Sequence, residues 1–308
     1  NYQSKSSYIM KNLIYSFRFI YLNFGLLAAF KIILIPYLLR NINFRHRAII
    51  DYLKKQNVDI INNYKQIEQT NEKLSDECPI WVCWFQGEDQ MPPLVKSCYN
   101  SILKYASTHP VKLITLENYN QYVSIPQYIL DKQKTGKISY AHLSDIIRVN
   151  LLADYGGIWL DATIFLTNEI KHWDLPFYSI KQDISNDFQY ASYYRWTGFC
   201  MGSVKKNPLF LFARDILYQY HKYKNELIDY FLLDYIIALG YNEIPSIKTM
   251  IDNVPYSNPN LYYIQTNISK PVNINEFNRI CQDTIFFKLN YKITIPSETN
   301  SLYYYLIQ

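Results

Sequence analysis

The chain has 308 residues, of which 49% are hydrophobic and 19% are charged. This composition supports a sizeable core and excludes a globally disordered chain. The net charge of +5 is concentrated in residues 1–55, where nine Lys and Arg residues against one Asp give +8, so the remaining residues sum to −3. That distribution excludes a basic nucleic-acid groove across the main body of the chain.

Residues 8–39 are mostly apolar and aromatic, but Arg18 and Lys31 interrupt them and Pro36 breaks a helix near its end. A membrane-spanning helix needs about 20 apolar residues with few charges, so this segment is a poor candidate for one. Apolar helices with scattered cations suit a membrane surface, where the cations meet anionic lipid. We therefore expect residues 1–50 to contact a membrane surface, the alternative being helices that pack on the protein's own core.

A helical pattern with many polar residues follows over residues 46–74 and predicts a long connecting helix. Turn-forming residues at 71–77, followed by Pro79, indicate a boundary. We therefore expect an N-terminal helical segment over residues 1–75 and an α/β domain over residues 76–308. Five cysteines without a C-x-x-C pair argue against disulfides and a zinc site, and favour the cytoplasm.

Strand and helix patterns alternate through the first part of the α/β domain. The run Ile80–Phe85 is continuously apolar, as expected of a buried parallel strand. The alternation predicts a parallel sheet with right-handed connections. The expected elements are strands over 80–85 and 111–116, helices over 93–105 and 126–136, a helix that ends at Gly156, and strands over 158–160 and 163–167.

The second part of the domain has a less regular pattern. Glycines punctuate residues 197–203, which would let the backbone approach a ligand, and residues 253–275 are expected to be mostly loop. The other expected elements are strands over 177–181, 190–196 and 284–289, helices over 207–223 and 226–239 (ended by Gly240), and a terminal element over 302–307.

Polar residues lie at both ends of the apolar stretch 144–163. Asp145 and Arg148 are three residues apart and share one face of a helix, which Gly156-Gly157 ends. A short apolar strand then leads to Asp161, and open α/β sheets bind ligands at the carboxyl ends of their strands. These residues predict a small polar site, whereas the plainer interpretation is a surface ion pair and a turn-forming aspartate.

The stretch resembles the signature of bacterial capsular polysaccharide synthesis proteins, which are similar to the sugar-binding D-x-D glycosyltransferases of family 32 type. The pattern is Ser144-Asp145-x-x-Arg148 followed by Gly156-Gly157-x-Trp159-x-Asp161, and the likeness extends to Ile80–Gly87. The resemblance implies a GT-A-like fold with a mainly parallel sheet flanked by helices. It also implies transfer of a sugar from a nucleotide-sugar donor, a UDP-sugar above all, with retention of configuration.

The resemblance also implies roles for individual residues. Asp145 and Arg148 would contact the sugar hydroxyls and phosphate of the donor, and Asp161 would hold the donor ribose or a divalent cation, Mn²⁺ or Mg²⁺. The further donor-binding candidates are Trp81, Trp84, Phe85, Gln86, Gly87, Ser144, Gly156, Gly157 and Thr163.

Thr163 stands where the D-x-D motif has its second carboxylate, so metal affinity should be weaker or should come from other ligands. Asp234, Asp283 and His142 are the candidates for those ligands. Their plainer interpretations are a solvated helix face for Asp234, a turn for Asp283 and a buried core histidine for His142.

The expected function is addition of a sugar to a growing, lipid-linked capsular or cell-surface polysaccharide at the inner face of the cell membrane. Two alternatives remain open. The first is a transferase that glycosylates protein. The second is a membrane-bound polysaccharide-assembly subunit with a degenerate donor site, which the replacement of the second carboxylate by Thr163 suggests. No glycine-rich phosphate loop and no G-x-S-x-G nucleophile motif competes with these interpretations.

Overall fold

The centre of the molecule is a five-stranded sheet with the strand order β2-β1-β3-β6-β5. β1 pairs in parallel with β2 and β3, whereas β6 is antiparallel to both β3 and β5, so only β6 runs against the other four. The computed structural model describes residues 2–68, 70–170, 174–183 and 188–308, with side chains from residue 11 onward. It confirms an α/β fold with a mixed, mostly parallel sheet. The strands are β1 (Ile80–Cys83), β2 (Val111–Ile114), β3 (Gly157–Asp161), β5 (Phe177–Ser179) and β6 (Cys200–Ser203).

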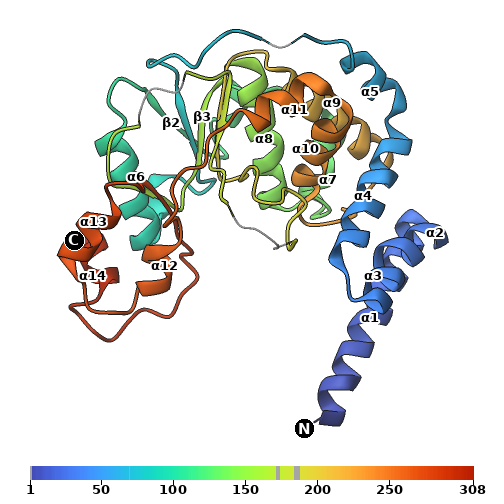
Figure 1. Ribbon diagram of the computed structural model, residues 1–308, viewed down its shortest axis with the longest axis horizontal. Helices are drawn as coiled ribbons and strands as arrows, with labels where there is room; N and C mark the ends of the chain where they lie inside the picture. The colour runs from blue at the N-terminus through green and yellow to red at the C-terminus, as the bar shows by residue number, and fades with distance from the viewer. Residues whose placement is uncertain (1, 69, 171–173, 184–187) are drawn as a thin grey trace.

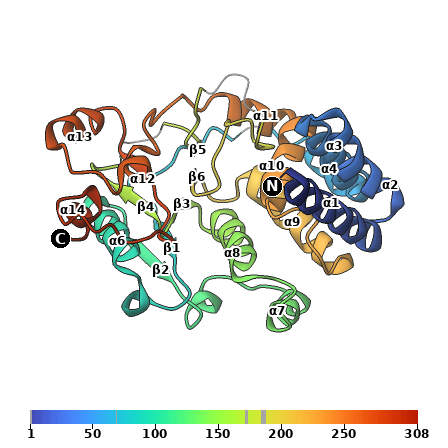
Figure 2. The same cartoon turned by 90° about the horizontal axis from the view of Figure 1, so that it is seen from below.

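Helices flank the sheet on two sides (Figures 1 and 2). On one side lie α8 (Tyr140–Asp154), α9 (Pro208–Tyr223) and α10 (Leu232–Glu243), and α8 packs along α9. On the other side α6 (Pro93–Tyr105) lies with the C-terminal helices. The remaining helices of the domain are α7 (Gln127–Lys134), α11 (Pro245–Asp252), α12 (Tyr263–Asn267), α13 (Ile274–Ile280) and α14 (Leu302–Ile307), with 3₁₀ turns at Glu88–Gln90 and Tyr119–Gln121.

A second, two-stranded sheet joins distant parts of the chain. β4 (Ile164–Leu166) pairs in antiparallel fashion with β7 (Phe286–Lys288), and the register sets Ile164 opposite Lys288. Phe287 is fully buried in an apolar cluster between α6 and the C-terminal helices, which holds this pairing in place. The pairing places Lys288 beside the segment that follows Asp161.

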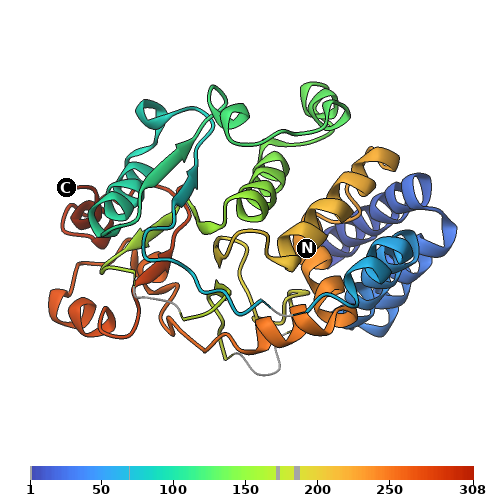
Figure 3. The same cartoon turned by 90° about the horizontal axis from the view of Figure 1, so that it is seen from above.

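The N-terminal helices form a separate layer at the end of the molecule away from the C-terminal helices (Figure 3). One face of this layer packs on the body through Ile32, Ile49 and Leu53, and α4 contacts α10. No helix in the described part of the chain is long and apolar enough to cross a membrane. The layer consists of α1 (Tyr2–Phe24), α2 (Leu26–Ala29), a π-helical turn (Phe30–Leu34), α3 (Ile35–Leu39), α4 (Ile42–Gln56) and α5 (Val58–Tyr64).

Three expectations about the elements are wrong. The single helix expected over 46–74 is instead two helices, α4 and α5, which are separated at Asn57, and the second ends at Tyr64. The expected strand 190–196 is a series of turns, because Tyr193 and Tyr194 have positive φ angles of 47° and 59° that a strand does not accept. The helix expected over 226–239 begins at Leu232 and continues past Gly240 to Glu243. Residues 253–275 are mostly loop, as expected, with α12 and the start of α13 among them, and the glycine-punctuated segment contains β6.

Candidate functional site

A cavity of about 600 Å³ opens where β1 and β3 end. Cys83 and Asp161 are paired at the carboxyl ends of these parallel strands, which is the edge of the sheet where the sequence predicts a site. α8, α10, β7 and the loop before β6 supply the other walls. The polar lining includes Gln86, Ser144, Asp145, Arg148, Asp161, Thr163, Asp234 and Lys288, and the aromatic lining includes Trp84, Phe85, Tyr140, Trp159, Trp196, Tyr262 and Tyr291.

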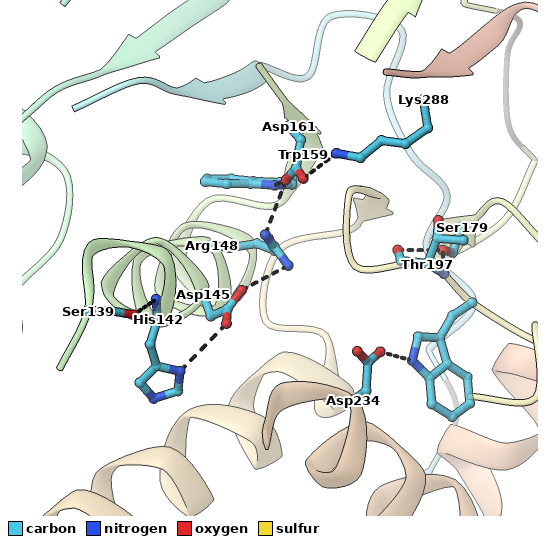
Figure 4. Close-up of polar contacts among 11 residues, drawn as sticks. Ser139, His142, Asp145, Arg148, Trp159, Asp161, Ser179, Thr197, Asp234 and Lys288 are labelled. Atoms are coloured by element: carbon cyan, nitrogen blue, oxygen red, sulfur yellow. Dashed lines mark hydrogen bonds and ion pairs between the residues drawn. The ribbon is translucent and has the colours of Figure 1, made fainter. Parts of the chain in front are cut away.

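Arg148 is the central cation of this cavity. Its Nη1 lies 3.3 Å from Oδ1 of Asp145, and its Nη2 lies 3.2 Å from Oδ1 of Asp161 (Figure 4). The guanidinium stacks over Trp159, 4.8 Å from the ring centroid, and the side chain is only 8% exposed. The interpretation of Asp145 and Arg148 as a surface ion pair is therefore wrong, because Arg148 joins α8 to the end of β3 inside the molecule.

Asp161 receives three donors. Oδ1 accepts from Arg148 and from Nε1 of Trp159 at 3.0 Å, and Oδ2 accepts from Nζ of Lys288 at 2.9 Å. Burial by itself would raise the pKa of this carboxyl. The charges of Lys288 and Arg148 and the hydrogen bonds from Lys288 and Trp159 outweigh burial and hold the pKa well below its usual range. Asp161 is thus a fixed anion that orders two cations.

Lys288 is a functional candidate that the sequence did not point to. Its Nζ also donates to Oγ1 of Thr163 at 2.7 Å, so it bridges the two polar positions of the Asp161-Ala162-Thr163 segment. In the sequence, Lys288 is only a lysine at the end of the apolar run Thr284–Phe287. Lysines at such positions are common in edge strands, so this one does not indicate a functional site. Its place in the site depends on the pairing of β4 with β7.

Asp234 faces the cavity from α10. Nε1 of Trp196 donates to its Oδ1 at 2.8 Å, and none of the described cations forms an ion pair with it. Burial raises the pKa of Asp234 to about 6, which the hydrogen bond from Trp196 opposes and the charge of Asp145 reinforces. Asp234 can therefore hold or release a proton near neutral pH, and it is not the solvated helix residue of the plainer interpretation.

His142 lies behind Asp145 on α8. Its Nδ1 is 3.6 Å from Oδ2 of Asp145, and its Nε2 is 2.7 Å from Nε2 of His221. Burial, together with the charge of His142, lowers the pKa of His221 to about 3. A neutral His221 can accept the hydrogen bond from Nε2–H of His142, which fixes the ring beside Asp145.

Three of the predicted donor-binding residues have structural positions outside the cavity lining. Nε1 of Trp81 donates to the carbonyl oxygen of Gly156 at 2.8 Å, and the ring is 2% exposed. Gly156 and Gly157 have φ angles of 69° and 100°, and a Cβ on Gly157 would lie 2.4 Å from the carbonyl oxygen of Pro79. These residues close the helix–strand turn that positions Asp161.

Two further predicted residues also lie outside the cavity lining. Gly87 has a φ of 85° and begins the turn after Gln86. Asp283 is exposed, and its Oδ1 accepts from Oγ1 of Thr284 at 3.1 Å. By contrast, Trp84, Phe85, Gln86, Ser144 and Thr163 do line the cavity, where the aromatic rings offer a surface for a base or a sugar ring.

The residues do not fit a divalent cation such as Mn²⁺ or Mg²⁺ in the arrangement they adopt. Both oxygens of Asp161 already accept from cations, and the hydroxyl of Thr163 accepts from Lys288. Among the described residues, no three His, Cys, Asp or Glu side chains are grouped to hold a metal ion. The ligand set expected from the D-x-D motif is therefore not assembled.

The chain is similar to several known proteins. Residues 32–307 match the model of a family described as capsular polysaccharide synthesis protein. The chain is 28% identical over 112 residues to the O-glycosyltransferase braB of Annulohypoxylon truncatum, and 24% identical over 124 residues to the O-glycosyltransferase PaGT of Phomopsis amygdali. These matches cover 33% and 37% of the chain but only 27% and 29% of the two relatives. A solved structure, the PaToxG glycosyltransferase, is 15% identical with a TM-score of 0.44, over 68% of this chain and 83% of that one.

Proposed function

The chain belongs to the capsular polysaccharide synthesis protein family, and from this premise we propose that it is a glycosyltransferase that uses a nucleotide-sugar donor, a UDP-sugar in the first instance. The observation that carries the proposal is the cluster of Arg148 and Lys288 around Asp161 at the carboxyl end of β3. Two ordered cations beside an aromatic-lined cavity suit a nucleoside diphosphate, whose phosphates need positive charge and whose base needs a ring to stack on.

Within this proposal, the fold is of the GT-A type and each residue of the cluster has a role. Arg148 contacts the diphosphate, because a guanidinium binds phosphate oxygens through two N–H groups. Asp145, tied to Arg148 at 3.3 Å, has its other carboxylate oxygen near His142 and can accept from a sugar hydroxyl. Trp84 lines the cavity, is half-buried and suits stacking on the base.

Transfer proceeds with retention in this proposal. The bond between the anomeric carbon and the diphosphate lengthens first, the acceptor hydroxyl attacks from the same face, and the leaving phosphate receives the acceptor's proton. Asp145 and Asp161 are both tied to cations, which disfavours either as a nucleophile. A glycosyl group trapped on a carboxylate of the protein, detected by mass spectrometry after a rapid quench, would contradict this mechanism.

The acceptor is proposed to be a lipid-linked saccharide. A second cavity of about 490 Å³ lies between the N-terminal layer and the loop before α10, and it shares Tyr190, Tyr230, Phe231 and Asp234 with the donor cavity. An acceptor held by its lipid at the N-terminal layer could therefore reach the donor. The connection between the two cavities favours a lipid-linked acceptor over the alternative of a protein acceptor, because a protein acceptor has no lipid to be held by the N-terminal layer.

The N-terminal layer carries an exposed apolar surface of the kind that a lipid-linked acceptor requires. Leu22, Leu27 and Leu38 are each about two-thirds exposed, and the exposed residues Arg18, Lys31 and Arg40 are close to them along the chain. Such a surface suits the inner face of a membrane with anionic lipids, so we propose a cytoplasmic, peripheral location. Flotation with vesicles tests this proposal. Leu22→Glu, Leu27→Glu and Leu38→Glu together should abolish binding to phosphatidylglycerol vesicles, whereas Ile295→Glu, at an equally exposed site outside the layer, should not.

A donor assay tests the activity itself. The full chain is incubated with UDP- and GDP-sugars, and release of the nucleoside diphosphate is measured with and without a lipid-linked saccharide. Turnover of one donor that rises with the acceptor supports the proposal. Absence of binding and of turnover for every donor would refute it and favour the assembly subunit with a degenerate site.

A further inference from the structure

We propose that Lys288 takes the position of the divalent cation in this site, so that the chain binds its nucleoside diphosphate without a metal ion. The inference rests on the proposed function and deepens it, because it identifies the group that receives the charge of the diphosphate. The side chain concerned, Lys288, lies at the junction of β3, β4 and β7.

The ammonium group of Lys288 lies where the D-x-D motif would hold a metal. Nζ is 2.9 Å from Oδ2 of Asp161 and 2.7 Å from Oγ1 of Thr163, which are the first and third positions of that motif. An ammonium group has three N–H donors, so these contacts leave one donor for a ligand in the cavity. The side chain is 21% exposed and lines that cavity.

The departure from the motif at Thr163 has a physical reason in this arrangement. A second carboxylate there would be needed to neutralise a divalent ion, whereas a single positive charge needs only Asp161 and a neutral acceptor. Asp161 pairs with both Lys288 and Arg148, and Arg148 also pairs with Asp145, so the two cations are already balanced by two carboxylates without a metal ion. A divalent ion would have to displace Lys288 and lie beside Arg148, which Coulomb repulsion disfavours.

The backbone holds the lysine in this place. Lys288 is opposite Ile164 in the β4–β7 ladder, and its backbone N–H donates to the carbonyl oxygen of Leu261 at 2.9 Å. The ring of Phe199 lies under the ammonium group, 4.9 Å from Nζ to the centroid. The cation is therefore positioned before a donor arrives, as preorganised electrostatic stabilisation requires.

The proposed transfer reaction needs no metal ion to balance its bonds and protons. The bond from the anomeric carbon to the diphosphate oxygen breaks, the acceptor oxygen bonds to that carbon, and the acceptor's proton passes to the leaving phosphate. Negative charge grows on the diphosphate in the transition state, and Lys288 and Arg148 stabilise that charge.

Isothermal titration of the full chain with UDP and GDP tests the inference. For whichever nucleotide binds, the wild-type Kd should be the same within about twofold in EDTA and in Mn²⁺. Lys288→Ala should weaken binding about tenfold to a hundredfold, the range expected when a charge-assisted hydrogen bond is lost. Lys288→Arg should restore most of the affinity, and Lys292→Ala, a nearby exposed lysine outside the cavity lining, should leave it unchanged.

The outcomes separate the inference from the proposed function. Binding that disappears in EDTA and returns with Mn²⁺ would overturn the inference and leave the proposed function standing, as would wild-type affinity in Lys288→Ala. Absence of binding of both nucleotides under both conditions would refute the proposed function as well. The comparison of EDTA with Mn²⁺ uses the wild-type chain, so it remains decisive if a variant does not fold.

Discussion

Replacing Asp161 with Asn tests both the stability and the chemistry of the site. The amide oxygen can still accept from Nε1 of Trp159, but the amide N–H₂ group would face the ammonium of Lys288, and both ion pairs would be lost. The side chain of Asp161 is 30% exposed, that of Lys288 21% and that of Arg148 8%. The contribution of each ion pair to stability should therefore lie between that of a surface ion pair and that of a buried one. We take about 1–2 kcal/mol for each pair, or roughly 2–4 kcal/mol together.

Thermal unfolding gives the first measurement for Asp161→Asn. At about 2–4 °C per kcal/mol for a chain of this size, the Tm should fall by roughly 4–16 °C. The depressed pKa of Asp161 means that its contribution to stability is present above the unfolded pKa and is lost as pH falls through the folded pKa. The difference in Tm should therefore be constant between about pH 5 and 8 and should shrink at lower pH.

Donor turnover gives the second measurement. Transfer should fall at least about a hundredfold in Asp161→Asn, because the two cations lose the group that orders them. The matched control is Asp283→Asn, an exposed carboxylate outside the cavity lining, which should change neither Tm nor turnover by a measurable amount. Wild-type Tm together with wild-type turnover in Asp161→Asn would refute this reasoning.

Three further predictions concern the same part of the molecule. Asp234→Asn should stabilise the protein by up to about 3 kcal/mol above pH 6 and by little near pH 4. The reason is that the pKa of Asp234 is raised to about 6, so wild-type stability falls as pH rises from about 4 to 6. Chemical denaturation at pH 4 and at pH 8 measures this effect, and an equal effect at both pH values would contradict it. Gly157→Ala should cost at least about 3 kcal/mol or prevent folding, because its Cβ would lie 2.4 Å from the carbonyl oxygen of Pro79; soluble expression with an unchanged Tm would rule this out. Burial raises the pKa of the Cys83 and Cys98 thiols to about 12, so Ellman's reagent at pH 8 should label neither until the protein unfolds, as peptide mapping would reveal.

The first strands and helices of the domain could be predicted because local signals determine them. β1 is a continuous apolar run, α6 begins at a proline that the first helical turn tolerates, and the Gly156-Gly157 turn has the positive φ angles that favour glycine. Asp145, Arg148 and Asp161 follow from that same short segment, so the sequence predicted that they lie together. Only the structure shows that Arg148 joins the two carboxylates.

The rest of the site depends on contacts between distant residues. Lys288 reaches Asp161 only through the register of β4 with β7, which no local pattern specifies. Trp81 looked like a candidate for stacking, yet its N–H satisfies the carbonyl oxygen of Gly156 inside the core. A tryptophan in an apolar strand gives no indication in the sequence of which face of the sheet it will occupy.

The separation of β3 and β7 along the chain has a consequence for biosynthesis. All five strands of the central sheet have been synthesised by Ser203, whereas Lys288 follows Asp161 by 127 residues. At roughly 5–20 residues per second, a ribosome adds Lys288 about 6–25 s after Asp161. During that interval a nascent chain carries the anion and the arginine of the site without its lysine. The proposed diphosphate site is thus completed only after every strand of the central sheet has been made.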